Sequence, residues 1–193
     1  LILGNVPDFL GVWIVVATMA SLVYGWDIKN RGTSDAIATL TGIVYIVLFP
    51  YFIVLIDGTK YRQLTWLVLI ASFGADIMAY FTGMAIGKHK MAPNLSPKKT
   101  IEGAVGGLIG SALFSALFGY FVMPEIVVKC AIIGAIGGAV SMAGDLTASA
   151  FKRQMGIKDY GNLIPGHGGI LDRFDSVLFV APFVYYFSVF VLQ

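Results

Sequence analysis

Six apolar segments, each long enough to cross a membrane, constrain the fold of this chain more than any other feature. The hydrocarbon core of a bilayer, about 30 Å thick, requires roughly twenty apolar residues in a helix. Hydrophobic residues make up 58% of the chain and charged residues 12%, whereas soluble domains carry about 25% charged residues. We therefore predict an all-α, polytopic transmembrane protein with about six helices. Their approximate ranges are 8–25, 36–56, 64–87, 103–123, 126–149 and 170–192.

The basic residues indicate how these helices are oriented. Ten of the thirteen Lys and Arg lie in the loops after the first, third and fifth segments or at the start of the sixth. Loops rich in Lys and Arg stay in the cytoplasm, so we expect this face to be cytoplasmic and the protein to lie in the inner (cytoplasmic) membrane. The longest polar loops, 88–102 and 150–169, are the expected cytoplasmic active-site loops. The ten residues are Lys29, Arg31, Lys88, Lys90, Lys98, Lys99, Lys152, Arg153, Lys158 and Arg173.

The chain contains no obvious internal repeat and no second soluble domain, so we expect residues 1–193 to form a single membrane-embedded domain. It begins with Leu1 rather than Met, and we expect it to represent about the C-terminal two thirds of a longer protein. Glycines spaced four apart, Gly103 with Gly107 and Gly134 with Gly138, predict closely packed helices.

Four aspartates, Asp76, Asp145, Asp172 and Asp175, lie within or at the start of apolar segments, where an unpaired carboxylate is costly. Asp145 and Ser149 are four residues apart, and Asp172 and Asp175 three, so each pair shares a helix face. If the last two segments pack together, these oxygens suit Mg²⁺, and a second cation is left open. Pairing with Lys or Arg, or helix capping, is the alternative for each aspartate.

A glycine-rich turn precedes the last segment. Pro165 disfavours helix before it, and Gly166, Gly168 and Gly169 permit a backbone that points several N–H groups at one place. Together with the following helix N-terminus, this arrangement is typical of an anion site. A tight re-entrant turn is the alternative for this segment. A lone histidine most often forms a structural hydrogen bond, and we take this as the default role of His167.

The other long loop is also basic. Ser96 and Thr100 are candidates to cap the fourth segment, and Lys98 and Lys99 lie where they would meet a phosphate. A basic juxtamembrane segment also attracts anionic lipid without catalysing any reaction, and this alternative stays open.

The run from Ser149 to Asp175 resembles the signature of the CDP-diacylglycerol synthase family, also called phosphatidate cytidylyltransferases. Two further stretches, Ser96–Gly103 and Asp76–Tyr80 with Gly83, resemble other motifs of that family, whose members usually have more N-terminal membrane helices than this chain. The residues that match the signature are Ser149, Lys152, Arg153, Lys158, Asp159, Gly161, Pro165, Gly166, His167, Gly168, Gly169, Asp172, Arg173 and Asp175.

The resemblance implies an Mg²⁺-dependent nucleotidyl transfer in which CTP and phosphatidate form CDP-diacylglycerol and pyrophosphate. It implies a membrane-lipid environment, a homodimer and no nucleic-acid partner. The expected catalytic residues are Asp145, Asp172, Lys152, Arg153, Lys158 and Asp175. The expected substrate-binding residues are Ser96, Lys98, Lys99, Ser149, His167, Gly168, Gly169, Arg173 and Asp76. The expected metal ligands are Asp145, Asp172, Asp175 and Ser149.

Two other functions compete with this hypothesis. A CTP-dependent polyprenol or lipid kinase would share the basic loops, the metal and the membrane. A cation channel or transporter would also contain intramembrane aspartates and broken helices, but it does not explain why cations and a glycine-rich turn gather on one face.

Overall fold

A computed structural model describes residues 6–24, 32–163 and 168–192 of the chain. The chain divides into two compact units, residues 1–51 and residues 52–193. The smaller unit contains α1 (Val6–Tyr24), α2 (Thr33–Ile43), the π-helical turn η2 (Val44–Leu48) and the start of α3 (Phe49–Asp57). Pro50 follows the π-helical turn and lacks the N–H of a regular helical hydrogen bond, which accounts for the irregularity at this point.

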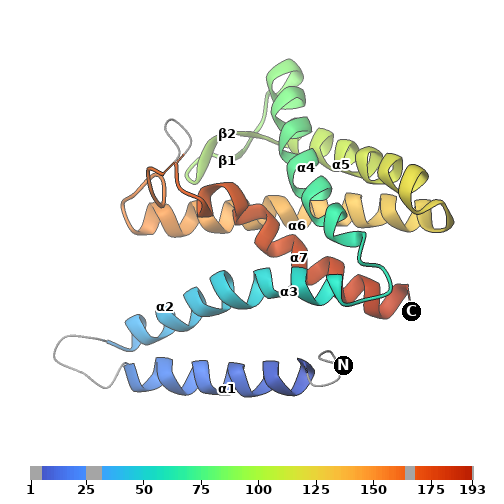
Figure 1. Ribbon diagram of the computed structural model, residues 1–193. Coiled ribbons are helices and arrows are strands. Elements are labelled where there is room, and N and C mark those ends of the chain that lie inside the picture. Colours follow the sequence, from blue (N-terminus) through green and yellow to red (C-terminus); the bar gives the residue numbers. More distant parts are fainter. Residues whose placement is uncertain (1–5, 25–31, 164–167, 193) are drawn as a thin grey trace. The chain divides into compact units, whose positions relative to one another are not determined.

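The larger unit contains the remaining long helices and one β-hairpin (Figure 1). Its elements are α4 (Leu64–Ile86), β1 (Lys90–Ala92), β2 (Ser96–Thr100), α5 (Ile101–Val122), the 3-10 turn η3 (Pro124–Ile126), α6 (Val127–Gln154) and α7 (Leu171–Val191). Helix α4 packs against α5, α6 and α7, and α6 packs against both α5 and α7. The antiparallel hairpin pairs Lys90 with Thr100 and Ala92 with Ser96.

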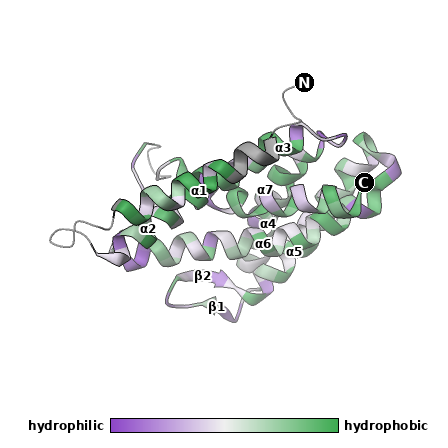
Figure 2. Cartoon of the chain, turned by 90° about the horizontal axis from the view of Figure 1, so that it is seen from below, coloured by the Kyte–Doolittle hydropathy of each residue, from purple (hydrophilic) through white to green (hydrophobic). Residues whose placement is uncertain are grey.

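The helices confirm the predicted all-α membrane architecture. Among the described residues, five helices are long and apolar enough to cross a membrane, at Thr33–Asp57, Leu64–Ile86, Ile101–Val122, Pro124–Gln154 and Leu171–Val191. A shorter apolar stretch, Val12–Val23, lies within α1. Figure 2 shows hydrophobic residues along the helices of the larger unit and more hydrophilic ones on the hairpin. The chain is therefore an integral membrane protein.

Two boundaries differ from those expected from the sequence. Helix α6 continues to Gln154, five residues beyond the predicted end at 149, so Lys152 and Arg153 are helical rather than in a loop. The loop expected at 88–102 contains the hairpin, and α5 begins within it at Ile101. Thr100 caps α5 as predicted, because its hydroxyl accepts a hydrogen bond from the Gly103 N–H at 3.1 Å.

The glycines pack the helices as predicted. A Cβ atom added at Gly103 or Gly107 would lie 2.7 or 2.8 Å from carbonyl oxygens of α4, and one at Gly134 would lie 2.5 Å from the Ser111 carbonyl of α5. Such short spacings exclude any side chain unless the helices separate. The buried Ser111 hydroxyl completes this core, since it lies 3.0 Å from the Ala71 carbonyl of α4 and 2.8 Å from the Gly134 carbonyl of α6.

Candidate active site

Two cavities in the larger unit share two aspartates, Asp76 of α4 and Asp145 of α6. The first, called here the hairpin cavity, has a volume of about 390 Å³ and lies between α4 and the β-hairpin. The second, the polar cavity, has a volume of about 490 Å³ and lies where α4, α6 and α7 meet. The shared aspartates mean that a group bound in one cavity lies close to a group bound in the other.

The polar cavity is lined mainly by charged side chains. Besides the shared pair, it contains three carboxylates, Asp159, Asp172 and Asp175, and two cations, Lys152 and Arg173. Five carboxylates therefore face two cationic groups. A bare triphosphate would be repelled by such a surface, whereas a phosphate that carries divalent cations would be attracted.

Lys152 lies at the centre of this cluster because α6 extends far enough to bring it beside the start of α7. Its ammonium is 2.8 Å from one carboxylate oxygen of Asp172 and 3.9 Å from the Asp175 carboxylate. It also lies 5.2 Å from the centre of the Tyr160 ring, within range of a cation–π contact. The Lys152 side chain is only 10% exposed and that of Asp172 only 5%, so this ion pair is screened from water.

The turn before α7 orients Asp172. The second carboxylate oxygen of Asp172 accepts hydrogen bonds from the backbone N–H groups of Gly169, at 2.9 Å, and Tyr160, at 2.8 Å. Gly168 has a φ of +84°, a conformation that favours glycine. A Cβ atom there would also lie 3.0 Å from the same oxygen. Gly169, one of the glycines expected to hold an anion, thus donates its N–H to a carboxylate of the chain itself.

Tyr160 is a site residue that the sequence did not reveal. Burial, together with the negative charges of Asp175 and Asp172, raises the pKa of the Tyr160 phenol, which therefore stays neutral at physiological pH. Its hydroxyl donates a hydrogen bond to the Ala148 carbonyl at 3.3 Å. The residue that matches the family signature is its neighbour Asp159, and no sequence pattern indicated that the tyrosine would turn inward.

The shared aspartates are each held by a different element. The Lys99 ammonium of β2 forms an ion pair with Asp145, and each of the two side chains is 24% exposed. Ser149, one turn further along α6, donates a hydrogen bond of 3.4 Å to Asp145. The Ser176 hydroxyl of α7 donates to Asp76 at 3.3 Å. Asp145 also lies within electrostatic range of both Asp76 and Asp175.

A second set of side-chain contacts anchors the hairpin that carries Lys99. The Glu102 carboxylate at the start of α5 lies 2.6 Å from Nδ1 of His89. It also accepts hydrogen bonds from the backbone N–H groups of Lys88, at 3.0 Å, and His89, at 3.2 Å. Glu102 thereby ties the segment leaving α4 to the helix that follows the hairpin. Neither residue was among the site residues expected from the sequence.

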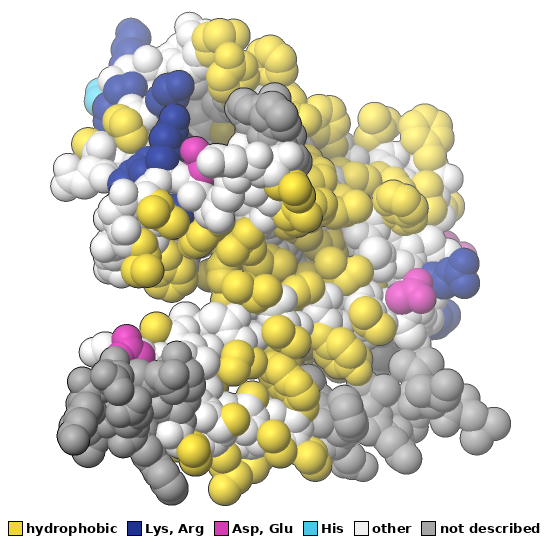
Figure 3. Space-filling view, turned by 60° about the vertical axis from the view of Figure 1, so that its left-hand side comes forward, with side chains coloured by type: hydrophobic (Ala, Val, Ile, Leu, Met, Phe, Trp, Pro, Cys, Tyr) yellow, Lys and Arg dark blue, Asp and Glu magenta, His cyan; other side chains and the backbone are white. Residues whose placement is uncertain are grey.

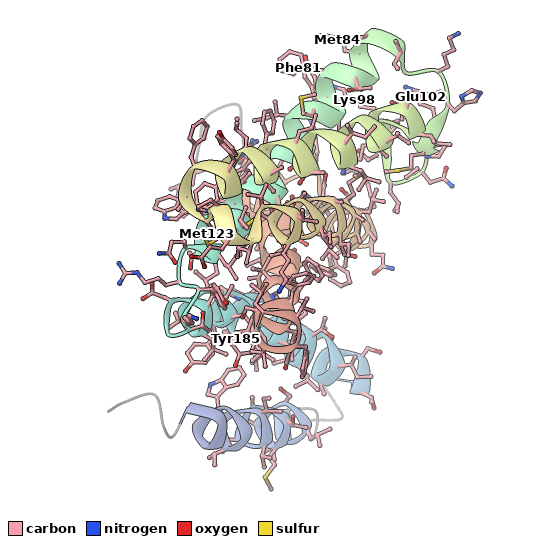
Figure 4. All side chains as sticks on the ribbon, turned by 90° about the vertical axis from the view of Figure 1, so that its right-hand side faces the viewer. Phe81, Met84, Lys98, Glu102, Met123 and Tyr185 are labelled. Carbon is pink, nitrogen blue, oxygen red and sulfur yellow. The ribbon has the colours of Figure 1, made fainter. Side chains whose placement is uncertain are left out.

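The structure brings most of the expected site residues together. Ser96, Lys98 and Lys99 line the hairpin cavity, and Lys152, Asp172, Arg173 and Asp175 line the polar cavity. Figure 3 shows Lys and Arg side chains gathered at one end of the larger unit beside a carboxylate. Figure 4 places Lys98 and Glu102 at the same end of that unit as Met84, and Met123 at the opposite end.

Several expected site residues lie elsewhere. Arg153 is exposed and donates a hydrogen bond to the Ile157 carbonyl at 3.0 Å just beyond α6. Lys158 is also exposed and lines neither cavity. Ser149 is not among the lining residues of either cavity and contacts the site through its hydrogen bond to Asp145. The expected role of His167 falls outside the described residues.

The described part of the chain has no group of three His, Cys, Asp or Glu side chains placed to hold a metal ion by themselves. Mg²⁺ needs no such group, because proteins often bind it through one or two carboxylates together with substrate phosphates and water. The surplus of carboxylates in the polar cavity fits that mode of binding.

The chain is similar to proteins of a known family. The model of a family described as "Cytidylyltransferase family" matches residues 2–191. Similar curated proteins include three that are named phosphatidate cytidylyltransferase. The Bacillus subtilis (strain 168) protein is 38% identical over 175 residues, which cover 88% of this chain and 65% of that protein. The Synechocystis sp. protein is 46% identical over 129 residues, which cover 66% of this chain and 44% of that protein. The Staphylococcus aureus (strain COL) protein is 37% identical over 194 residues, covering 94% of this chain and 74% of that protein.

Proposed function

The chain belongs to the cytidylyltransferase family, and from that premise we propose that it joins CTP to phosphatidate, forming CDP-diacylglycerol and pyrophosphate. The chain spans 65% and 44% of the length of the Bacillus and Synechocystis relatives, both named for this activity. The observation that carries the proposal is the pair of cavities that meet at Asp76 and Asp145, beside cationic groups from the hairpin, α6 and α7.

In the proposed reaction a phosphate oxygen of the lipid attacks the α-phosphorus of CTP. A new phosphorus–oxygen bond forms, the bond between the α-phosphorus and the bridging oxygen breaks, and pyrophosphate leaves with the electron pair. The attacking phosphate is already ionised near neutral pH, so a strong general base is not needed. The chain must instead bring two anions together and stabilise the charge on the leaving group.

The described residues suit these tasks. Lys152 and Arg173 in the polar cavity, with Lys98 and Lys99 in the hairpin cavity, would bind phosphate oxygens. Asp172, which is oriented by two backbone N–H groups, would keep the Lys152 ammonium in place. Mg²⁺ is part of this proposal. Asp145, Asp172 and Asp175 are the candidate ligands. One or two of them would hold the ion together with substrate phosphates and water, with Ser149 acting through Asp145, and the ion would neutralise phosphate charge.

The proposal also covers location and assembly. Eight of the thirteen Lys and Arg lie in the larger unit within residues 88–99 and 152–173, in the segments that adjoin the two cavities, which supports an active site open to the cytoplasm. The homodimer implied by the family resemblance remains part of the proposal, and light scattering of the protein in detergent tests it.

The central experiment gives the purified protein labelled CTP, phosphatidate and Mg²⁺ in detergent micelles. We expect both CDP-diacylglycerol and pyrophosphate to appear. A lipid kinase would instead release CDP and a phosphorylated lipid, and a channel would conduct ions without CTP. Asp145→Asn and Asp172→Asn should lose most activity while remaining folded, whereas Asp57→Asn, an exposed control outside both cavities, should stay active. Full activity of either site variant would refute its assigned role.

A further inference from the structure

The two cavities differ in chemical character. The hairpin cavity combines an apolar wall with a cationic rim: Tyr80 and Met84 of α4 and Met91 of β1 form the wall, and Lys98 and Lys99 form the rim. The polar cavity has apolar contacts only from Phe73 and Ile77 among its described lining residues. One cavity therefore suits an amphipathic anion, and the other suits a highly charged ligand that arrives with cations.

The apolar wall of the hairpin cavity continues onto the outer surface of a membrane-spanning helix. Tyr80 and Met84 are each 66% exposed, and α4 is one of the helices long and apolar enough to cross the membrane. Residues four apart lie on the same helix face, so these two side chains form a continuous apolar edge. A lipid chain can lie along this edge without leaving the hydrocarbon layer.

Charge complementarity indicates which end of such a ligand enters the cavity. Lys98 is exposed at the rim, and Lys99 lies deeper, where it pairs with Asp145. Figure 4 shows Lys98 and Met84 at the same end of α4 and α5. A phosphate between the two lysines would be next to Asp145, the residue that also borders the polar cavity.

We propose that the hairpin cavity is the lipid subsite, in which phosphatidate enters sideways from the membrane past Tyr80 and Met84 and places its phosphate at Lys98 and Lys99. The nucleotide then occupies the polar cavity with its cations, and the two substrates meet at Asp76 and Asp145. This assignment rests on the proposed function, since it names which cavity takes which substrate.

Another groove, of about 440 Å³ on the outer surface of the helices, is a weaker candidate for the lipid. It lies between α4 and α5, and its lining is wholly apolar: Ile70, Gly74, Ile77, Phe114, Leu117, Phe118, Phe121 and Val122. Such a groove offers a phosphate headgroup no partner, although an acyl chain would be compatible with it. It therefore serves as the alternative in the test.

The first test uses a variant that adds bulk to the apolar wall of the hairpin cavity and leaves its charged groups unchanged. In Met84→Trp we expect the KM for phosphatidate to rise about tenfold, with the KM for CTP and kcat changed less than about twofold, because only lipid binding is weakened. Phe81→Trp is the matched control, because Phe81 is an exposed neighbour on α4 that lines neither cavity. An increase in the KM for CTP alone, or in both KM values equally, would overturn the assignment.

A second test locates bound phosphatidate directly in the wild-type protein and requires neither a variant nor catalysis. Phosphatidate with a photoreactive diazirine on one acyl chain is bound to the wild-type protein without CTP, irradiated and mapped by mass spectrometry. Adducts on Tyr80, Met84 or Met91 are expected, and excess unlabelled phosphatidate should suppress them. Adducts on Phe114 and Phe118 instead would overturn the proposal. If these expected adducts form but no CDP-diacylglycerol is made in the assay, the proposed function fails while the lipid subsite stands.

Discussion

Lys152 near the end of α6 and Asp172 in the first turn of α7 form an ion pair of 2.8 Å that is almost closed to water. The pair joins the two ends of the long polar connection between these helices. Twenty residues separate the partners, yet the ammonium and the carboxylate meet because α6 extends beyond the apolar segment predicted from the sequence. The ion pair thus defines one wall of the polar cavity.

Removing this cation should destabilise the protein. In Lys152→Met, the buried Asp172 and Asp175 lose their nearest described cation, and breaking a buried pair on one side costs about 3–5 kcal/mol. The melting temperature in detergent should fall by about 6–20 °C. Lys158→Met, which changes an exposed lysine, should shift it by far less. If Lys152→Met unfolds at the temperature of the wild type, the pair does not stabilise the fold.

The Glu102 carboxylate should hold the hairpin in place. In Glu102→Ala, the His89 ring and two backbone N–H groups lose their acceptor, and hydrogen bonds to a charged group are stronger than those between neutral groups. Hydrogen exchange of residues 88–100 should rise at least about tenfold. The KM for phosphatidate should also increase, because the hairpin carries Lys98 and Lys99.

Glu125→Ala supplies the control for this experiment. Glu125 is an exposed acid at the other end of α5, and its loss should leave exchange in the hairpin unchanged. Equal exchange in the Glu102 variant and the wild type would mean that other contacts position the hairpin.

Close packing of α5 and α6 should be sensitive to a single methyl group. In Gly134→Ala, the new Cβ would lie 2.5 Å from the Ser111 carbonyl and from the Ser115 hydroxyl, so the helices must move apart. Overpacking of this kind costs about 1–3 kcal/mol. Thermal unfolding should show a lower melting temperature for this variant than for Gly42→Ala, whose Cβ meets nothing within 4 Å. The same melting temperature for both would argue against the tight α5–α6 interface.

Asp76 should contribute to function at the expense of stability. Asp76→Asn removes one negative charge from a site where Asp145 repels it and lowers the cost of burying the group. A gain of about 1 kcal/mol would raise the melting temperature by about 2–4 °C. CDP-diacylglycerol synthesis should fall, because the residue borders both cavities. A variant that is both less stable and fully active would contradict both parts of this prediction.

Local sequence patterns were sufficient to predict the helices and their packing glycines. Long apolar segments specify transmembrane helices because the bilayer cannot satisfy an open backbone. The four-residue spacing of Gly103, Gly107, Gly134 and Gly138 likewise places small residues on one helix face. The hairpin was missed for a physical reason: its strands are short and contain Pro97, and contacts to Glu102 help to hold it in place.

Hydropathy and residue spacing act along the chain, so they were enough to predict that this protein is helical, spans a membrane, and concentrates cations and carboxylates in a few segments. Which of these groups meet depends on how the helices pack. The packing pairs Lys99 with Asp145, which is 46 residues away in the sequence. It places the Asp172 carboxylate where it accepts hydrogen bonds from Lys152 and from two backbone N–H groups. It also forms the polar cavity and the hairpin cavity as two separate sites. These pairings depend on which helix faces pack together and where each helix ends, and the order of residues does not encode either locally.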